Sequence, residues 1–144
     1  MHQRILVVCV GNICRSPLAA QVLQATFPEK QLSSAGLAAV VGSDVHPVTR
    51  EIAAAHGMSL NGHRARQLTR DMCHEADLIL VMESGHREAV LQLCPEVRGK
   101  IFLLAQGQDS PSISDPFRRS SEFFALVHQQ IVQACMCWAA LLRR

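Results

Sequence analysis

The chain has 144 residues, a length that predicts one compact domain. Its hydrophobic content of 49% is enough for an ordinary core, which argues against disorder and against a fold that depends on disulfides. The net charge of +2 lacks the basic excess that is typical of nucleic-acid-binding proteins. Since neither a signal-peptide pattern nor an apolar run of about 20 residues is apparent, we expect a cytoplasmic protein without membrane insertion.

The first predicted elements alternate between strand and helix. Residues 4–10 are almost uniformly apolar and β-branched, which indicates a strand buried on both faces of a parallel sheet. Ser16 and Pro17 then begin a helix, because Ser can cap the free N–H groups and Pro fits the first turn. A weaker strand is predicted over 31–37, and a helix over 47–57 that opens with Pro and closes with Gly.

The second half continues this alternation. Strands are predicted over 76–82 and 100–104, and a helix capped by its first residue over 84–93. A polar loop over 107–116 is long enough to be functional. The last helix, over 124–142, carries one apolar stripe at steps of three and four residues. The pattern predicts an open α/β sheet whose ligand crevice lies beyond the carboxyl ends of the strands.

The cysteines do not suggest a disulfide scaffold or a metal site. Six are present, namely Cys9, Cys14, Cys73, Cys94, Cys135 and Cys137. Disulfide scaffolds are typical of short, secreted chains with little core. No C-x2-C pair occurs, and the seven histidines do not stand at zinc-ligand spacing around the cysteines. We therefore predict reduced thiols and no bound metal.

The segment from Cys9 to Pro17 joins the first strand to the first helix, at the predicted crevice. A loop that enters a helix N-terminus directs backbone N–H groups inward and forms a cradle for an anion. Gly11 is expected to adopt a conformation closed to most residues, and Asn12 can hold a left-handed turn. The segment lacks the Lys of a Walker A motif, which argues against nucleotide hydrolysis.

Three side chains of this region have the chemistry of phosphoryl transfer. Arg15 offers a planar fork that can bind two oxygens of a tetrahedral dianion. The N–H groups, Arg15 and the Ser16 hydroxyl are expected to stabilise a nucleophilic thiolate at Cys9. A leaving oxygen needs an acid, and Asp115 is the best candidate, although Asp-Pro dipeptides are also common in turns.

Cys9 through Pro17, taken with Asp115 and Pro116, resembles the low-molecular-weight protein tyrosine phosphatase family. Residues 34–36, 63–69 and 77–83 follow in the family's order, so the resemblance covers essentially the whole chain. It implies a single domain over residues 1–144. The implied fold is an open four-stranded parallel sheet flanked by helices, with the phosphate-binding loop between strand 1 and helix 1.

The resemblance also implies a role for each site residue. Cys9 would form a phosphocysteine, Arg15 would bind the phosphoryl oxygens, and Asp115 would protonate the tyrosine oxygen and then activate water. No metal or other cofactor takes part in such a mechanism. The remaining phosphate-loop residues would be Val10, Gly11, Asn12, Ile13, Cys14 and Ser16. His63 would order Asn12, and Cys14 would protect Cys9 from overoxidation through a reversible disulfide.

The rim of the site distinguishes this chain within the family. The chain has Phe117 after Asp-Pro and no tyrosine at all, which excludes regulation by tyrosine phosphorylation. Leu37 and Val40 would give the slot an aliphatic wall together with Ile13. This rim resembles the bacterial members associated with exopolysaccharide export. The implied partner is a phosphotyrosine protein, namely the tyrosine autokinase of that system.

Two alternatives remain at this stage. A thiol-linked arsenate reductase shares the fold and the loop but relays oxidation through two closely spaced cysteines, whereas Cys73 and Cys94 are far apart in the sequence. A silent phosphate-binding module would keep the cradle without catalysis, but Cys9, Arg15 and Asp115 are all present. The sequence leaves the physiological substrate and the oligomeric state open.

Overall fold

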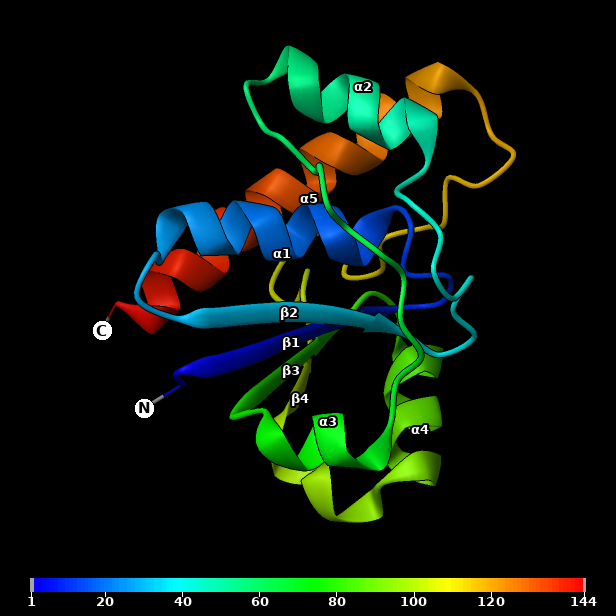
Figure 1. Ribbon diagram of the computed structural model, residues 1–144. Coiled ribbons are helices and arrows are strands. Elements are labelled where there is room, and N and C mark those ends of the chain that lie inside the picture. The colour runs from blue at the N-terminus through cyan, green and yellow to red at the C-terminus, as the bar shows by residue number, and fades with distance from the viewer. Residues whose placement is uncertain (1, 144) are drawn as a thin grey trace.

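The computed structural model describes residues 2–143 and centres on one four-stranded sheet, in which all strands are parallel (Figure 1). The strand order is β2-β1-β3-β4. The strands are β1 (Arg4–Cys9), β2 (Gln31–Gly36), β3 (Leu78–Val81) and β4 (Ile101–Leu103). The predicted four-stranded parallel sheet is therefore confirmed. Each strand begins and ends within one residue of its predicted bounds, except that β3 begins two residues later than predicted.

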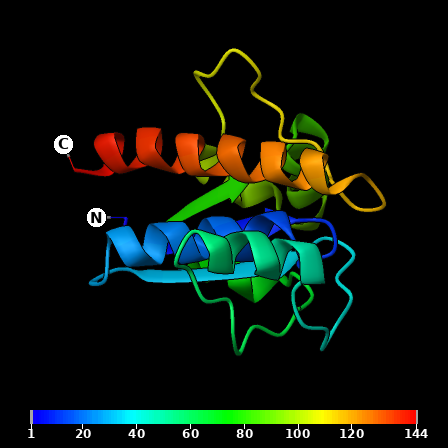
Figure 2. The same cartoon turned by 90° about the horizontal axis from the view of Figure 1, so that it is seen from above.

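Helices cover both faces of the sheet (Figures 1 and 2). One face carries α1 (Arg15–Thr26), α2 (Pro47–Ala55) and α5 (Ser121–Leu142). The other carries α3 (Arg70–Glu75), α4 (Ser84–Leu93) and the 3-10 helix η1 (Pro95–Lys100). The sequence did not predict α3 or η1, because six residues are too few to establish a helical periodicity.

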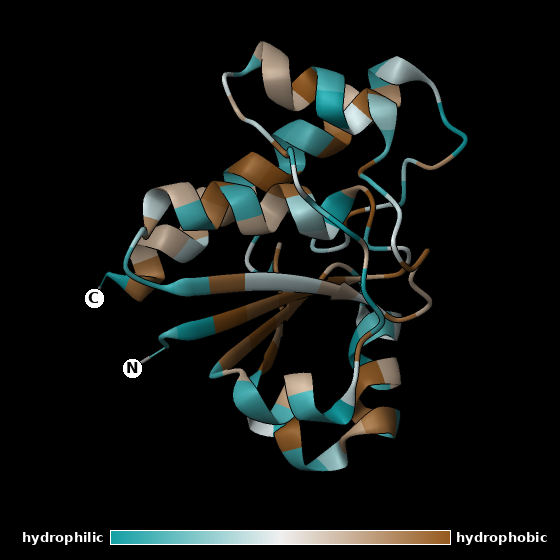
Figure 3. Ribbon diagram, viewed as in Figure 1, coloured by the Kyte–Doolittle hydropathy of each residue, from teal (hydrophilic) through white to brown (hydrophobic). Residues whose placement is uncertain are grey.

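Strand β1 separates two hydrophobic cores, because successive side chains point to opposite faces of the sheet. Ile5, Val7 and Cys9 join the core under α1 and α5, whereas Leu6 and Val8 join the core under α3 and α4. After the exposed Arg4 that begins β1, the inner strands β1 and β3 are accordingly apolar, as the colouring of Figure 3 shows. Cys9 is thus placed on the α1 face of the sheet.

Two helix starts differ from the prediction. Helix α1 begins at Arg15, and its N-cap Cys14 makes no side-chain capping bond. Ser16 lies inside the first turn, where its hydroxyl is committed to other partners described below. Ser84 is the first residue of α4 rather than its cap. The Ser16 prediction was wrong because Cys9 and Asn12 bind its hydroxyl, which is therefore not available as a cap. The Ser84 prediction was wrong because Glu83 occupies the N-cap position of α4.

Helix α5 corrects another expectation. It is long and apolar enough to cross a membrane by length and composition, although the sequence was expected to contain no such segment. In the structure its apolar stripe packs on the sheet and on α1, with Val127, Ile131 and Trp138 buried. Trp138 donates a hydrogen bond from Nε1 to the Leu104 carbonyl at 2.8 Å, which ties the helix to the end of β4.

The register of the sheet sets the end of β1 beside Gly36, the last residue of β2. A Cβ atom on Gly36 would lie 2.4 Å from the Val10 carbonyl oxygen, so only glycine fits here. The loop after β1 can therefore rest directly on β2. The loop and the end of β2 therefore pack directly against each other at the carboxyl edge of the sheet.

We predict that Gly36→Ala lowers the free energy of unfolding by about 1–3 kcal/mol, the usual cost of overpacking. Gly85→Ala is the matched control, because a Cβ there meets no atom within 4 Å. Urea denaturation of both variants tests the difference. Equal stability of the two would contradict the close packing of Gly36.

Candidate active site

The carbonyl oxygens of the loop after β1 all point away from its centre. Backbone N–H groups of neighbouring segments donate to the carbonyls of Cys9, Val10, Gly11 and Ile13 at 2.8–3.1 Å. The Asn12 carbonyl accepts a hydrogen bond from His63 Nε2 at 2.7 Å. In a trans peptide the N–H points opposite to the C=O. The N–H groups that follow these carbonyls therefore face the inside of the loop.

These inward N–H groups are free to bind an anion. None of the backbone N–H groups from Gly11 to Cys14 has a hydrogen-bond acceptor among residues 2–143. Buried backbone donors are almost always paired in native proteins. The N-terminus of α1 adds its positive dipole at the same place. The loop is therefore a cradle that fits a tetrahedral anion such as a phosphoryl group.

Cys9 lies on the floor of this cradle and is 2% exposed. Its Sγ atom is 2.9 Å from the Ser16 hydroxyl. That hydroxyl already accepts a hydrogen bond from Asn12 Nδ2 at 2.8 Å, so its own hydrogen is free to point at the sulfur. The Ser16 hydroxyl thereby supports negative charge on the Cys9 sulfur.

Asn12 holds the shape of the loop. It adopts the left-handed backbone conformation at φ 60°, which Asn tolerates better than most residues. Its side chain is fully buried: Nδ2 also donates to Ser34 at 3.0 Å, and Oδ1 accepts from the Arg66 N–H at 3.0 Å. The expectation that Gly11 supplies a special conformation was wrong, because its φ is not in the left-handed region.

Arg15 is buried beside the cradle and is fixed from behind. Its Nη1 atom donates to Glu83 Oε2 and to the Ile113 carbonyl, both at 2.7 Å. These two bonds leave Nη2 directed toward Asp115, whose Oδ2 is 3.9 Å away. The guanidinium is 2% exposed and so depends on Glu83 for its counter-charge. The sequence analysis missed Glu83, although it directly follows the β3 segment at the predicted edge of the sheet.

A histidine lies behind this ion pair. His86 Nε2 is 3.3 Å from Glu83 Oε2, and the side chain is largely buried. Burial, and then the charge of Arg15, lower the pKa of His86 below its usual value. A neutral His86 leaves the Glu83 carboxylate to act as the counter-ion of Arg15.

The long loop after β4 carries Asp115 to the cradle because Ile113 anchors it. The Ile113 side chain is completely buried, and its N–H donates to the Met82 carbonyl at 3.0 Å. Two residues later, Asp115 is half exposed at the mouth of the site. The Phe117 N–H donates to Asp115 Oδ1 at 3.0 Å and fixes the carboxyl group. No polar motif marks Ile113, so sequence reasoning could not identify its role.

A cavity of about 200 Å³ opens above Cys9. Besides Cys9, it is lined by the predicted residues Val10, Gly11, Ile13, Cys14, Arg15, Val40, Asp115 and Phe117, and by Ala38, which was not predicted. Val40 and Phe117 are about half exposed and form the rim. Leu37 does not line the cavity. It continues the β1–β2 ladder and, like Ala35 two residues earlier, packs into the core under α3 and α4. Ala38 takes its place.

Cys14 is a neutral thiol next to the cradle. Burial raises its pKa to about 12, although Thr49 contributes a hydrogen bond that acts in the opposite direction. All six cysteines are free. The protective disulfide with Cys9 therefore stays a prediction.

The two cysteines that an arsenate reductase relay would use lie away from the cradle. Cys73 is in α3 and Cys94 follows α4, so both belong to the helix layer opposite α1. Both are buried, and burial raises the pKa of Cys73 to about 11. Neither thiol is placed to attack an oxidised Cys9, which belongs to the other core.

Comparisons with known proteins agree with this geometry. A family model described as low molecular weight phosphotyrosine protein phosphatase matches residues 4–144. The low molecular weight protein-tyrosine-phosphatase Wzb of Escherichia coli strain K12 is 46% identical over 142 residues, which cover 99% of this chain and 97% of that protein. The crystal structure of the tyrosine phosphatase AmsI from Erwinia amylovora has a TM-score of 0.98 at 43% identity and covers 100% of this chain and 95% of that one.

A third relative was solved with a ligand. Vibrio vulnificus Wzb in complex with benzylphosphonate has a TM-score of 0.93 at 43% identity and covers 97% of this chain and 99% of that one. The family model, the full-length relatives and the cradle around Cys9 all point the same way: this chain belongs to the low-molecular-weight protein tyrosine phosphatase family.

Proposed function

We propose that this phosphatase hydrolyses phosphotyrosine through a phosphocysteine on Cys9, with Arg15 as the phosphate-binding residue and Asp115 as the acid and base. The observation that carries this mechanism is the loop whose carbonyls are all bonded outward. A cradle of unpaired N–H groups with a buried guanidinium at its side stabilises the charge of a transferring phosphoryl group. The nucleophile lies on the floor of that cradle.

In the first step, Cys9 Sγ attacks phosphorus in line with the tyrosine oxygen. The S–P bond forms while the P–O bond breaks, and Asp115 gives its proton to the leaving oxygen. The loop N–H groups and Arg15 Nη2 bind the phosphoryl oxygens throughout. The position of Asp115 at the mouth, opposite the floor that holds Cys9, is consistent with an in-line path.

In the second step, the Asp115 carboxylate takes a proton from water, and the water oxygen attacks phosphorus. The S–P bond breaks and inorganic phosphate leaves. The electron pair returns to the Cys9 sulfur, where the Ser16 hydroxyl stabilises it. Every group in this cycle belongs to the protein or to water, so no cofactor is needed.

The depth of the cavity supports phosphotyrosine as substrate. Cys9 is buried, whereas the rim residues Val40 and Phe117 are half exposed, so the phosphate must reach the floor on a long side chain. The rim and wall are apolar at Ile13, Val40 and Phe117, which suits the two faces of a phenyl ring. Benzylphosphonate, the ligand of the Vibrio vulnificus relative, also joins a phenyl ring to a phosphorus group.

We further propose that the substrate protein is a bacterial tyrosine autokinase that controls exopolysaccharide production. The aliphatic wall of the cavity at Ile13 and Val40, and the similarity of this chain to Wzb and AmsI, support this partner. A cytoplasmic location fits the six free cysteines, because reduced thiols persist in a reducing compartment.

Aryl phosphate hydrolysis tests the mechanism. Cys9→Ser is expected to abolish turnover, and Asp115→Asn to lower kcat by about 10²- to 10⁴-fold, the usual contribution of a general acid. Asp109→Asn, an exposed position in the same loop, serves as the control and should retain wild-type activity. Equal, negligible rates for all these proteins and the wild type would favour a binding module. A comparable rate on phosphoserine peptides would contradict the preference for phosphotyrosine.

Glu83 is expected to act as a positioning residue for Arg15. Glu83→Gln removes the charge from one hydrogen bond, which should lower kcat/KM about 10- to 100-fold and weaken inhibition by inorganic phosphate. Glu88→Gln is the control. The Glu88 side chain is 71% exposed, and within residues 2–143 its one salt bridge is with Arg87. If phosphate inhibition stays unchanged while stability falls, Glu83 is structural only.

Substrate trapping tests the partner. Asp115→Ala should form the phosphocysteine slowly, so the noncovalent complex with tyrosine-phosphorylated proteins should persist and retain them from a lysate of an exopolysaccharide-producing bacterium. The autokinase is the protein expected by mass spectrometry, and vanadate should release it by competing for the cradle. Vanadate-sensitive retention of other phosphoproteins without the autokinase would overturn this partner while leaving the mechanism intact.

A further inference from the structure

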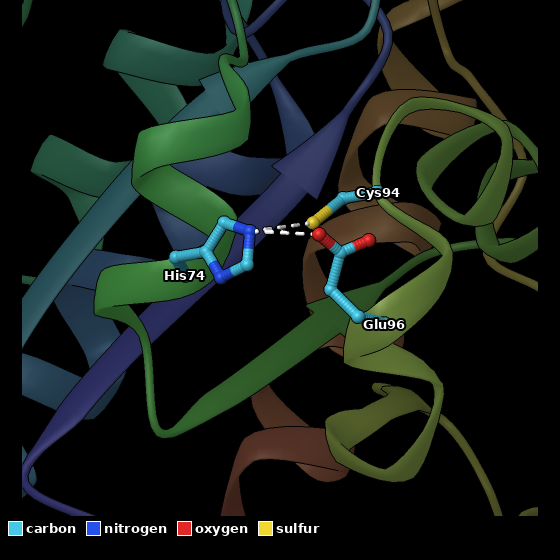
Figure 4. A group of neighbouring side chains, drawn as sticks. All are labelled: His74, Cys94 and Glu96. Atoms are coloured by element: carbon cyan, nitrogen blue, oxygen red, sulfur yellow. Dashed lines mark hydrogen bonds and ion pairs between the residues drawn. The ribbon is translucent and has the colours of Figure 1, made fainter.

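A second cluster of reactive side chains lies on the side of the sheet opposite the active-site helix α1. His74 in α3, Cys94 between α4 and η1, and Glu96 in η1 point toward one another, as Figure 4 shows. Their nitrogen, sulfur and oxygen atoms all lie within 4.8 Å of one another. The proposed phosphatase mechanism uses none of them. Cys94 and Glu96 are two residues apart in one turn of the chain, and the tertiary fold brings His74 from α3 beside them.

The contacts converge on a single atom. His74 Nε2 is 3.4 Å from Cys94 Sγ and 3.0 Å from Glu96 Oε2. A Cys-His-Glu proton relay would need the thiol and the carboxylate on different ring nitrogens. Here both face the same nitrogen, so the cluster is not built as a relay. Three ligand atoms that face a common point are instead the arrangement of a metal site.

The spacing fits a tetrahedral ion. Zinc bonds of about 2.0 Å to nitrogen or oxygen and 2.3 Å to sulfur place tetrahedral ligand atoms roughly 3.3–3.6 Å apart. The Sγ–Nε2 distance already lies in this range, and the Nε2–Oε2 distance needs to open by only a few tenths of an ångström. A thiolate, an imidazole and a carboxylate together select Zn²⁺ or Co²⁺ over the hard cations Mg²⁺ and Ca²⁺.

We propose that His74, Cys94 and Glu96 form a zinc site that joins α3 to the α4–η1 turn, with water as the fourth ligand. Cys94 is fully buried, whereas the side chains of His74 and Glu96 are about half exposed, so an ion can approach from solvent. On binding, the Cys94 thiol releases its proton to solvent and the sulfur donates an electron pair to the ion. The site crosslinks elements that no disulfide connects.

Two neighbouring cations oppose the ion: Arg70, which pairs with Glu96, and Lys100, whose Nζ lies 3.1 Å from the His74 carbonyl oxygen. Arg70 Nη2 lies 2.6 Å from Glu96 Oε2, the same oxygen that faces His74. A zinc ion must therefore displace this ion pair or use the second carboxylate oxygen. Both side chains of this ion pair are about half exposed, and exposed ion pairs stabilise a protein little. Breaking the pair therefore costs little of the free energy of zinc binding.

Cobalt binding to the purified Cys9→Ser protein tests the site, because this variant removes the thiolate at the floor of the active-site cavity, which could compete for the ion. One equivalent of Co²⁺ should give thiolate charge-transfer bands and the visible bands of a tetrahedral ion, and Zn²⁺ should abolish them. Adding Cys94→Ala should remove the thiolate bands. His74→Ala and Glu96→Gln should each weaken binding at least about 10-fold.

The control is Cys137→Ser, which removes a partly exposed thiol in α5 and should leave the bands unchanged. Circular dichroism of each variant shows whether it folds. If Cys94→Ala does not fold, a second measurement takes its place: Zn²⁺ should protect Cys94 of the Cys9→Ser protein from alkylation. Absence of the thiolate bands, their persistence without Cys94, or unprotected Cys94 would overturn the site. Because the protein used is already inactive, neither result bears on the proposed phosphatase mechanism.

Discussion

The structure depends above all on hydrogen bonds that are made outside the active-site loop. Neighbouring segments bind the loop's carbonyls, and this alone turns the intervening N–H groups inward. The donors come from the segment after β2, from His46 before α2 and from His63. Segments that lie up to about fifty residues away in sequence therefore determine the orientation of a loop of five residues. The cradle therefore forms only when these segments are folded together at the carboxyl edge of the sheet.

The Arg15 guanidinium is likewise held by residues that are remote in sequence, here from the β3 and β4 half of the sheet. Arg15 starts α1, Glu83 follows β3, and Ile113 lies in the loop after β4. Two hydrogen bonds to one nitrogen of Arg15 orient the fork before any substrate arrives, so little ordering remains when the phosphoryl group binds. Ile113 also connects to Met82 and thereby sets the position of Asp115. The ends of β1, β3 and β4 thus fix the relative positions of the nucleophile, the phosphate-binding residue and the acid.

The six cysteines show how strongly the surroundings decide the chemistry of one residue type. Cys9 faces a ring of N–H groups and a hydroxyl, which suits a nucleophile. Cys14 and Cys135 are buried, and burial raises the pKa of each thiol to about 12, so both thiols are neutral. Cys94 faces an imidazole and a carboxylate, the partners of a metal ligand. The number of cysteines in the sequence carries none of this information.

The sequence by itself determined the parallel α/β sheet, the place of the loop between β1 and α1, and the candidates Cys9, Arg15 and Asp115. It could do so because strand periodicity and the residue types of the loop are local properties. Leu37, Gly11 and the Ser16 cap were misjudged, because strand alternation, backbone angles and a hydroxyl's partner depend on contacts that are remote in sequence. Only the tertiary structure decided the roles of Glu83 and Ile113 and assembled His74 with Cys94 and Glu96, because these side chains meet across separate elements of the sheet edge and the helix layer.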